Sequence, residues 1–87
     1  MQHDFRVLVF GSARDICGSA EIVVRHSAPT ITARRLRELI EARMDDSAWR
    51  STIQVSAISS NCEYVTDDTV ELAATAEIAV VPPVSGG

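Results

Sequence analysis

The residues best suited to chemistry lie at the carboxyl end, where the sequence runs Val-Pro-Pro-Val-Ser-Gly-Gly from Val81. Pro82 and Pro83 favour an extended path, so the segment would lose little entropy on docking. Gly86 and Gly87 have no side chains, and a narrow channel could therefore admit them. Residues 82–87 span about 20 Å when extended, enough to reach into a deep cleft. The carboxylate of Gly87 could then meet ATP or a thiol donor inside another protein.

The alternative for the same segment is a frayed terminus of small residues, which is common at chain ends.

Residues 1–81 contain no Ser-His-Asp set with a nucleophile elbow, no glycine-rich phosphate loop and no carboxylate pair placed for acid–base work. The two histidines and two cysteines, His3, His26, Cys17 and Cys62, lack the spacing of a metal site or a disulfide framework. We expect reduced thiols, no bound metal or other cofactor, and no catalysis by the domain alone.

The composition predicts one folded domain. The chain has 87 residues, of which 46% are hydrophobic and 23% are charged. Its net charge of −4 argues against nucleic acid as a ligand. Lysine is absent, which excludes the chain as a lysine-linked acceptor of another modifier and excludes a lysine nucleophile. Apolar runs are only a few residues long, so we expect no signal peptide, no membrane span and a cytoplasmic location.

The first part of the chain predicts two paired strands. The run Phe5–Phe10 is apolar on both faces, as in a central buried strand. Ser12–Cys17 could form one helical turn, capped by Ser12 and closed by Gly18. Glu21–His26 is a second apolar run. Because the two runs are close in sequence, we expect them to pair antiparallel.

The strongest helix signal follows Pro29. Thr32 can cap this helix, and spacings of three and four place one apolar stripe toward a sheet. The stripe contains Ala33, Leu36, Leu39, Ile40 and Met44. The opposite face is rich in arginine, and a solvated surface with the pairs Arg34–Glu38 and Arg37–Glu41 is favoured over an anion-binding patch.

The second part of the chain predicts further strands. Asp45–Ser51 is a polar connection in which we expect Trp49 to fold back on the edge of the core. Thr52–Ser59 alternates apolar and polar residues, the pattern of a third strand. Shorter apolar segments follow at Tyr64–Val65 and at Val70 with Leu72. Ala76–Val81 lacks a polar face, so it is expected to be a central last strand that ends at the two prolines.

This order of elements predicts an α+β fold. A mixed sheet of about four to five strands, with one main helix packed on one face and the first and last strands parallel, is the β-grasp or ubiquitin-like architecture. We expect a β-grasp domain over residues 1–81 and a flexible tail over residues 82–87.

Three segments carry a resemblance to a known family. Val-Leu-Val-Phe-Gly-Ser-Ala-Arg-Asp at 7–15 is followed by Gly18, Ser-Asn-Cys-Glu-Tyr-Val occupies 60–65, and Pro-Pro-Val-Ser-Gly-Gly ends the sequence. Together they resemble the small, sulfur-carrying subunit of molybdopterin synthase over nearly the whole chain. Two departures occur: Ser60 replaces an apolar residue, and residues 74–78 lack the family's Asp-Gly-Asp-Glu-Val turn, which leaves the structure of that turn open.

The resemblance implies a mechanism in which the domain is a carrier. A ubiquitin-activating-like adenylyltransferase would use ATP and magnesium to adenylate the carboxylate of Gly87. A persulfide sulfur donor would displace AMP to give a thiocarboxylate. The tail, with Pro82 to Gly86, would enter the active site of the large synthase subunit, where two sulfur transfers convert cyclic pyranopterin monophosphate to molybdopterin. Two small and two large subunits form an elongated heterotetramer in that family, and the large subunit supplies the catalytic side chains.

The resemblance also implies a contact surface. Phe10, Tyr64 and Val81 match positions that face the large subunit and the activating enzyme, although apolar strand residues are more often ordinary core. Arg14 is expected to be an ion-pair partner within its turn. Two other functions stay open: sulfur delivery for thiamin thiazole or tRNA thiolation, and a ubiquitin-like modifier attached to target lysines.

Overall fold

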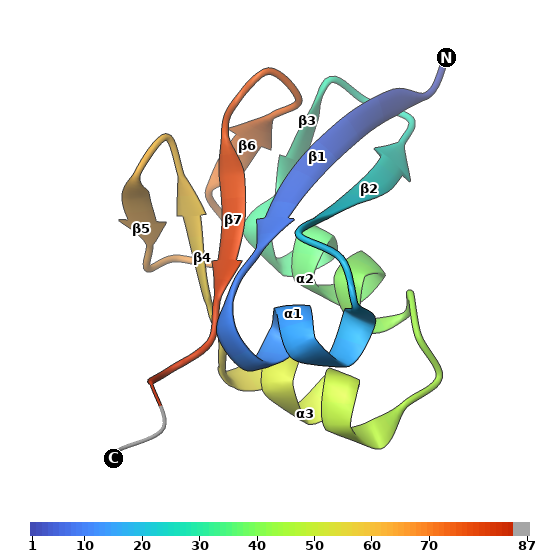
Figure 1. Cartoon of the computed structure of the whole chain (residues 1–87). Coiled ribbons are helices and arrows are strands. Elements are labelled where there is room, and N and C mark those ends of the chain that lie inside the picture. The colour runs from blue at the N-terminus through green and yellow to red at the C-terminus, as the bar shows by residue number, and fades with distance from the viewer. Residues whose placement is uncertain (85–87) are drawn as a thin grey trace.

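A computed structural model describes residues 1–84 of the chain (Figure 1). Seven strands and three helices follow one another in that part. Their order is β1 (His3–Val9), α1 (Gly11–Cys17), β2 (Glu21–His26), β3 (Thr30–Thr32), α2 (Ala33–Glu41), α3 (Ser47–Val55), β4 (Ala57–Ser60), β5 (Glu63–Val65), β6 (Glu71–Ala73) and β7 (Ile78–Val81).

The main sheet has five strands in the order β2-β1-β7-β4-β5. β1 pairs antiparallel with β2, and it pairs parallel with β7, where Val7 lies opposite Ile78. The predicted antiparallel pair, the parallel pairing of first and last strands and the central position of the last strand are therefore confirmed. β3 and β6 form a separate two-stranded sheet. That second sheet was not expected from the sequence.

The core lies between one face of the main sheet and the helices (Figure 1). Phe5, Val7 and Val9 alternate along β1 and are buried, and the α2 stripe contributes Leu36 and Ile40. Thr32 caps α2 as predicted, because its hydroxyl oxygen accepts from the backbone N–H of Arg35 at 3.2 Å. Leu39 and Met44 pack against this core from partly buried positions. Met44 follows the end of α2 at Glu41.

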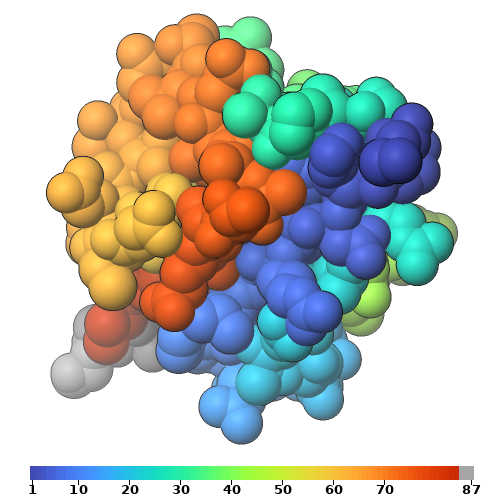
Figure 2. Space-filling view, turned by 90° about the horizontal axis from the view of Figure 1, so that it is seen from above, coloured from blue at the N-terminus to red at the C-terminus, as the bar shows by residue number. Residues whose placement is uncertain are grey.

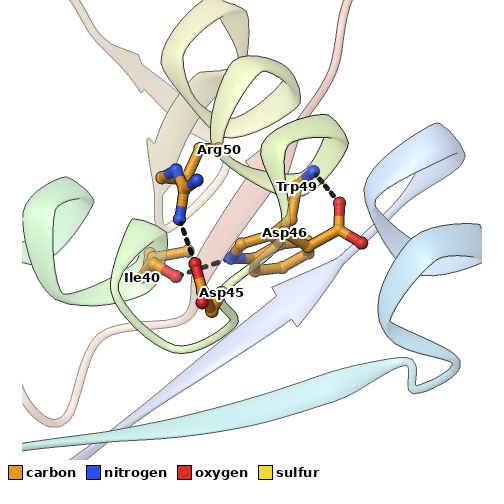
Figure 3. Close-up of polar contacts among 5 residues, drawn as sticks. All are labelled: Ile40, Asp45, Asp46, Trp49 and Arg50. Atoms are coloured by element: carbon orange, nitrogen blue, oxygen red, sulfur yellow. Dashed lines mark hydrogen bonds and ion pairs between the residues drawn. The ribbon is translucent and has the colours of Figure 1, made fainter.

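The predicted strand Thr52–Ser59 is wrong over its first part, where α3 continues to Val55, and is confirmed only from Ala57, where β4 begins. Asp46 caps α3 by accepting from the N–H of Trp49 at 2.9 Å (Figure 3). Trp49 is fully buried rather than at the core edge, and its indole Nε1–H donates to the carbonyl of Ile40 at 2.8 Å. The predicted α+β fold with a mixed sheet is confirmed, and α3, with nine residues like α2, is a second helix of the same length.

Some local predictions around the helices also differ from the structure. α1 begins at Gly11, with Phe10 rather than Ser12 at the cap position and no side-chain cap bond, whereas Gly18 closes it at φ +73° as predicted. In α2, Glu38 pairs with Arg35 at 3.2 Å instead of Arg34.

Arg37 does not pair with Glu41. Its guanidinium donates to the carbonyls of Ile53 and Ser56, each at 2.7 Å, because α3 ends next to it. Within residues 1–84, Arg14 forms no ion pair. In the same range, no helix is long and apolar enough to cross a membrane.

Candidate functional site

The base of the carboxyl-terminal arm is anchored to the body. β7 ends at Val81, and the next residue, Pro82, is buried, whereas Pro83 and Val84 are exposed. The Pro82 ring lies next to the backbone of Gly11, where an added Cβ would be 3.7 Å from ring carbons Cγ and Cδ. The exposed part of the arm that the structure describes therefore begins at Pro83.

A groove surrounds this base. It has a volume of about 380 Å³ and is lined by Phe10, Gly11, Ser12 and residues 81–84. Gly11 has a φ of +57°, a conformation that glycine adopts without strain. Figure 2 shows the last described residues at the margin of the molecule, beside the N-terminal part of the chain. Ser85, Gly86 and Gly87, the reacting end of the predicted tail, lie outside the described residues.

The face of the main sheet opposite the helices is open. Strand alternation places Val81 and Ala79 on this face of β7, with Ala57 and Ser59 opposite them on β4. Tyr64 lies opposite Ser59 on β5. Ala57, Ser59 and Ala79 are small, whereas Leu8 of β1 lies opposite Ala79 on the other side of β7.

The three residues predicted to contact a partner all belong to this side of the molecule. Phe10 is 45% exposed and Tyr64 is 65% exposed, so the alternative that they are core residues is wrong for both. Val81 is half-buried. Phe10 and Val81 line the groove at the base of the arm, while Tyr64 lies on the edge strand and lines a different groove.

Sequence reasoning missed the small residues of the open face and the role of Gly11. Ala57 and Ser59 were hidden because Thr52–Ser59 was interpreted as one strand. Gly11 was only a strand end in that interpretation. The sequence did contain a signal for this contact. Gly11 follows the first predicted strand and Pro82 follows the last, and parallel neighbouring strands end at the same edge of a sheet.

The metal-ligand and cysteine side chains of the described residues are dispersed. Within residues 1–84 no group of three or more His, Cys, Asp or Glu side chains could hold a metal ion. Both cysteines are free, with Cys17 half-buried and Cys62 exposed. The Cys17 thiol donates to the carbonyl of Ser19 at 3.3 Å. The described site therefore consists of exposed and half-buried apolar residues and an anchored arm base.

These features define the class of protein: a β-grasp domain with an arm that continues from its central strand. Comparison with known families then identifies the chain as a member of the ThiS family, which matches residues 7–87. Members of this group are sulfur carriers. The family match covers both the open face and the whole arm.

Two relatives match nearly the full chain. A molybdopterin synthase sulfur carrier subunit from Dictyostelium discoideum is 28% identical over 88 residues and covers 100% of both chains. A protein of the same name from Arabidopsis thaliana is 29% identical over 84 residues, covering 97% of this chain and 83% of the relative.

Solved structures support the fold. SAMP1 from Haloferax volcanii has a TM-score of 0.68 at 21% identity and covers 97% of this chain and 99% of its own. The HVO 2177 protein of the same organism has a TM-score of 0.76 at 20% identity, covering 99% of this chain and 88% of its own. A complex of subunits 1 and 2 of molybdopterin-converting factor from Helicobacter pylori contains a chain with a TM-score of 0.65 at 21% identity, with full coverage of both.

Proposed function

We propose that this protein is the sulfur carrier of molybdenum cofactor biosynthesis, acting as the small subunit of molybdopterin synthase. The observation that carries the proposal is the end-to-end match to relatives of that name, 28% identical over all of both chains. The anchored arm base supports it, since the chain passes from the central strand β7 through buried Pro82 to the exposed Pro83 and Val84.

The chemistry of the proposal takes place on the terminal carboxylate of Gly87. A carboxylate is a poor electrophile, so a ubiquitin-activating-like enzyme transfers AMP to it from ATP with magnesium and releases pyrophosphate. The outer sulfur of a cysteine persulfide attacks the acyl carbon and AMP leaves, which gives an acyl disulfide. A second thiol then attacks the cysteine sulfur of that disulfide, so that a cysteine disulfide forms and the thiocarboxylate is released. In the active site of the large subunit that sulfur passes to cyclic pyranopterin monophosphate.

In this proposal the body of the domain binds and the arm delivers. Phe10 and Val81 provide apolar contact at the base of the arm, and Tyr64 provides it at the margin of the open face. Aromatic side chains in such positions contribute strongly to binding because they bury a large area with few rotatable bonds. Pro82 to Gly86 form the segment that enters the partner, where the glycines leave room for a narrow channel.

The direct test is the intact mass of the protein. Purified protein is first weighed to establish that the natural chain ends at Gly87. It is then incubated with the activating enzyme, ATP, magnesium, a persulfide donor and a reducing thiol, and we expect a mass increase of roughly 16 Da as sulfur replaces oxygen. An unchanged mass, with an enzyme that loads another carrier in parallel, contradicts the proposal.

The matched control is deletion of Gly87. The shortened chain should not be loaded, yet its circular dichroism and melting temperature should match those of the parent protein, since terminal residues beyond the packed body contribute little to stability. Loss of folding on this deletion would contradict the separation between body and arm.

A carrier for a different pathway is the second candidate, because the matching family is ThiS and family membership alone does not fix the sulfur acceptor. The two candidates share the loading step and differ in the recipient. Loaded protein should convert cyclic pyranopterin monophosphate when the large synthase subunit is added. Sulfur transfer only with a thiazole-forming or tRNA-thiolating system would favour the second candidate.

A further inference from the structure

A second groove lies away from the arm, between the edge strand β5 and strand β6. It has a volume of about 480 Å³. Its lining combines apolar side chains, including exposed Tyr64 and Val70, with the carboxylates of Glu63 and Glu71. In Figure 2 the β4–β5 hairpin and the following segment, in yellow and orange, lie together on one side of the molecule. Of its lining residues, the function proposed above uses only Tyr64, at the margin of the open face.

The β5 edge of the groove has main-chain N–H and C=O groups that point away from the sheet. The N–H of Asn61 donates to the carbonyl of Glu77 at 2.8 Å. Main-chain groups of every second residue point to the same side of a strand, so the N–H and C=O of Ser59 also point toward β7. Its cross-strand neighbour Tyr64 consequently directs its own N–H and C=O away from β4. β5 ends the sheet, so those two groups lie along an unpaired edge.

The β6 side of the groove has a similar character. The carbonyl of Val70 accepts from the N–H of Ala33 at 2.9 Å. The main-chain groups of Val70, and of Leu72 two residues later, therefore point toward β3 and the residue that follows it. The main-chain groups of Glu71, between them, therefore point away from β3. Two strand edges with outward polar groups thus belong to one groove, an arrangement that suits an extended polypeptide.

The negative charge of this region favours a basic segment as the occupant of the groove. Residues 51–87 contain five acidic residues and no arginine, lysine or histidine. Four of the five lie at 63–71, and no basic side chain of residues 1–84 forms an ion pair with them. Thr69 lowers the pKa of Asp67 by donating its hydroxyl and N–H to that carboxylate, which favours the charged form. Such a field attracts cations and repels acidic segments.

We propose that the groove between β5 and β6 binds an extended, basic segment of a partner protein, which adds to the β5 edge at Tyr64 and places arginine or lysine side chains beside Glu63 and Glu71. Side chains of an extended segment alternate between its two faces, so apolar residues between the basic ones would face Val70 and the Tyr64 ring. The short edge and exposed charges make this a weak contact. It is independent of the chemistry at Gly87.

The test is an NMR titration of the ¹⁵N-labelled full chain with an acetylated, amidated peptide of sequence Arg-Val-Arg-Val-Arg. We expect the largest shifts at the Tyr64 amide and at residues 63–72, and weaker binding as salt is raised. The combined substitutions Glu63→Gln and Glu71→Gln should reduce affinity about three- to tenfold. Glutamine preserves the acceptor that Glu71 presents to the Thr30 hydroxyl at 3.1 Å, so folding should be retained.

Matched controls separate this site from general attraction to a negatively charged protein. Glu38→Gln with Glu41→Gln removes the same charge from α2 and should leave affinity unchanged. The peptide Glu-Val-Glu-Val-Glu should not bind, and methylation of the central backbone nitrogen of the basic peptide should weaken binding. The proposal is overturned if the basic peptide does not bind, if its shifts map to another face, or if the α2 substitutions weaken binding as much as the groove substitutions.

Discussion

Trp49 connects two helices through a single side chain. Its ring is fully buried, its indole N–H donates to Ile40 near the end of α2, and its own backbone N–H is capped by Asp46 at the start of α3 (Figure 3). Arg50 adds an exposed ion pair with Asp45 at 3.0 Å in the same connection. Exposed pairs of this kind contribute little, so the ring and its hydrogen bond account for most of the local stability.

Replacing Trp49→Phe should therefore destabilise the fold. The change removes the donor to Ile40 and leaves unfilled volume, for an expected loss of about 1–3 kcal/mol in the free energy of unfolding. Urea denaturation followed by far-ultraviolet circular dichroism measures it. Val55→Ala is the matched control on the same helix: Val55 is 66% exposed, and a change within about 0.5 kcal/mol is expected. Equal losses in both variants would show that the burial of Trp49 is not what stabilises α3.

The Asp67 carboxylate gives a pH-dependent prediction at the same scale. The side-chain hydroxyl of Thr69, and then its backbone N–H, lower the Asp67 pKa below the ordinary value of 3.8. Since the folded pKa is depressed, the stabilising contribution is present above 3.8 and is lost as pH falls through the folded value. Thr69→Val removes the hydroxyl but keeps the N–H, so the Asp67 midpoint in an NMR titration should rise. An unchanged midpoint would contradict the assigned cause.

Between elements, Arg37 joins α2 to the end of α3. Its guanidinium donates to the carbonyls of Ile53, in the last turn of α3, and of Ser56, the residue after the helix. The Ile53 carbonyl also accepts from the N–H of Ser56 at 3.2 Å. Arg34, three positions earlier in α2, is exposed. The two arginines have the same side chain, but Arg37 is the one that hydrogen-bonds to the segment between α3 and β4.

Arg37→Met should lower the free energy of unfolding by about 1–3 kcal/mol, because two partly buried carbonyls lose a charged donor while the side-chain volume is kept. Arg34→Met is the control, and it should change stability by no more than about 0.5 kcal/mol. Thermal and urea unfolding of the two variants measure the difference. If Arg34→Met costs as much, the arginines contribute through net charge and not through the contact with α3.

The same elements show how far the sequence could predict the structure. β1, β2, α2 and β7 were predictable because their apolar patterns and caps agree with the buried faces they form. α3 was not, since Ile53 and Val55 alternate like a strand although the Asp46 cap and the four-residue spacing of Trp49 and Ile53 favour a helix. Part of the candidate site was equally hidden: the burial of Pro82 against Gly11 depends on strand ends distant in sequence.

At the scale of the whole molecule, the surfaces for which we propose functions lie outside the buried core. The helices cover one face of the sheet, and the arm leaves from the end of β7 (Figure 1). The groove with Glu63 and Glu71 lies at the β5 edge. Stability resides in side chains such as Trp49 and Phe5, which the proposed partners do not touch. Variants of the exposed residues should therefore change binding without changing folding.

Phe10→Asp tests that separation in the proposed synthase. Phe10 is 45% exposed beside the base of the arm, so the charge can be solvated in the free domain but would be desolvated against an apolar partner surface. We expect affinity for the large synthase subunit, measured by surface plasmon resonance, to fall at least about tenfold with the melting temperature nearly unchanged. Ala48→Asp places the same charge at an exposed position in the first turn of α3, the end of that helix away from β4, and should bind like the parent protein. If Phe10→Asp binds normally while Ala48→Asp does not, the helical side of the domain faces the partner and the assignment of the contact surface is wrong.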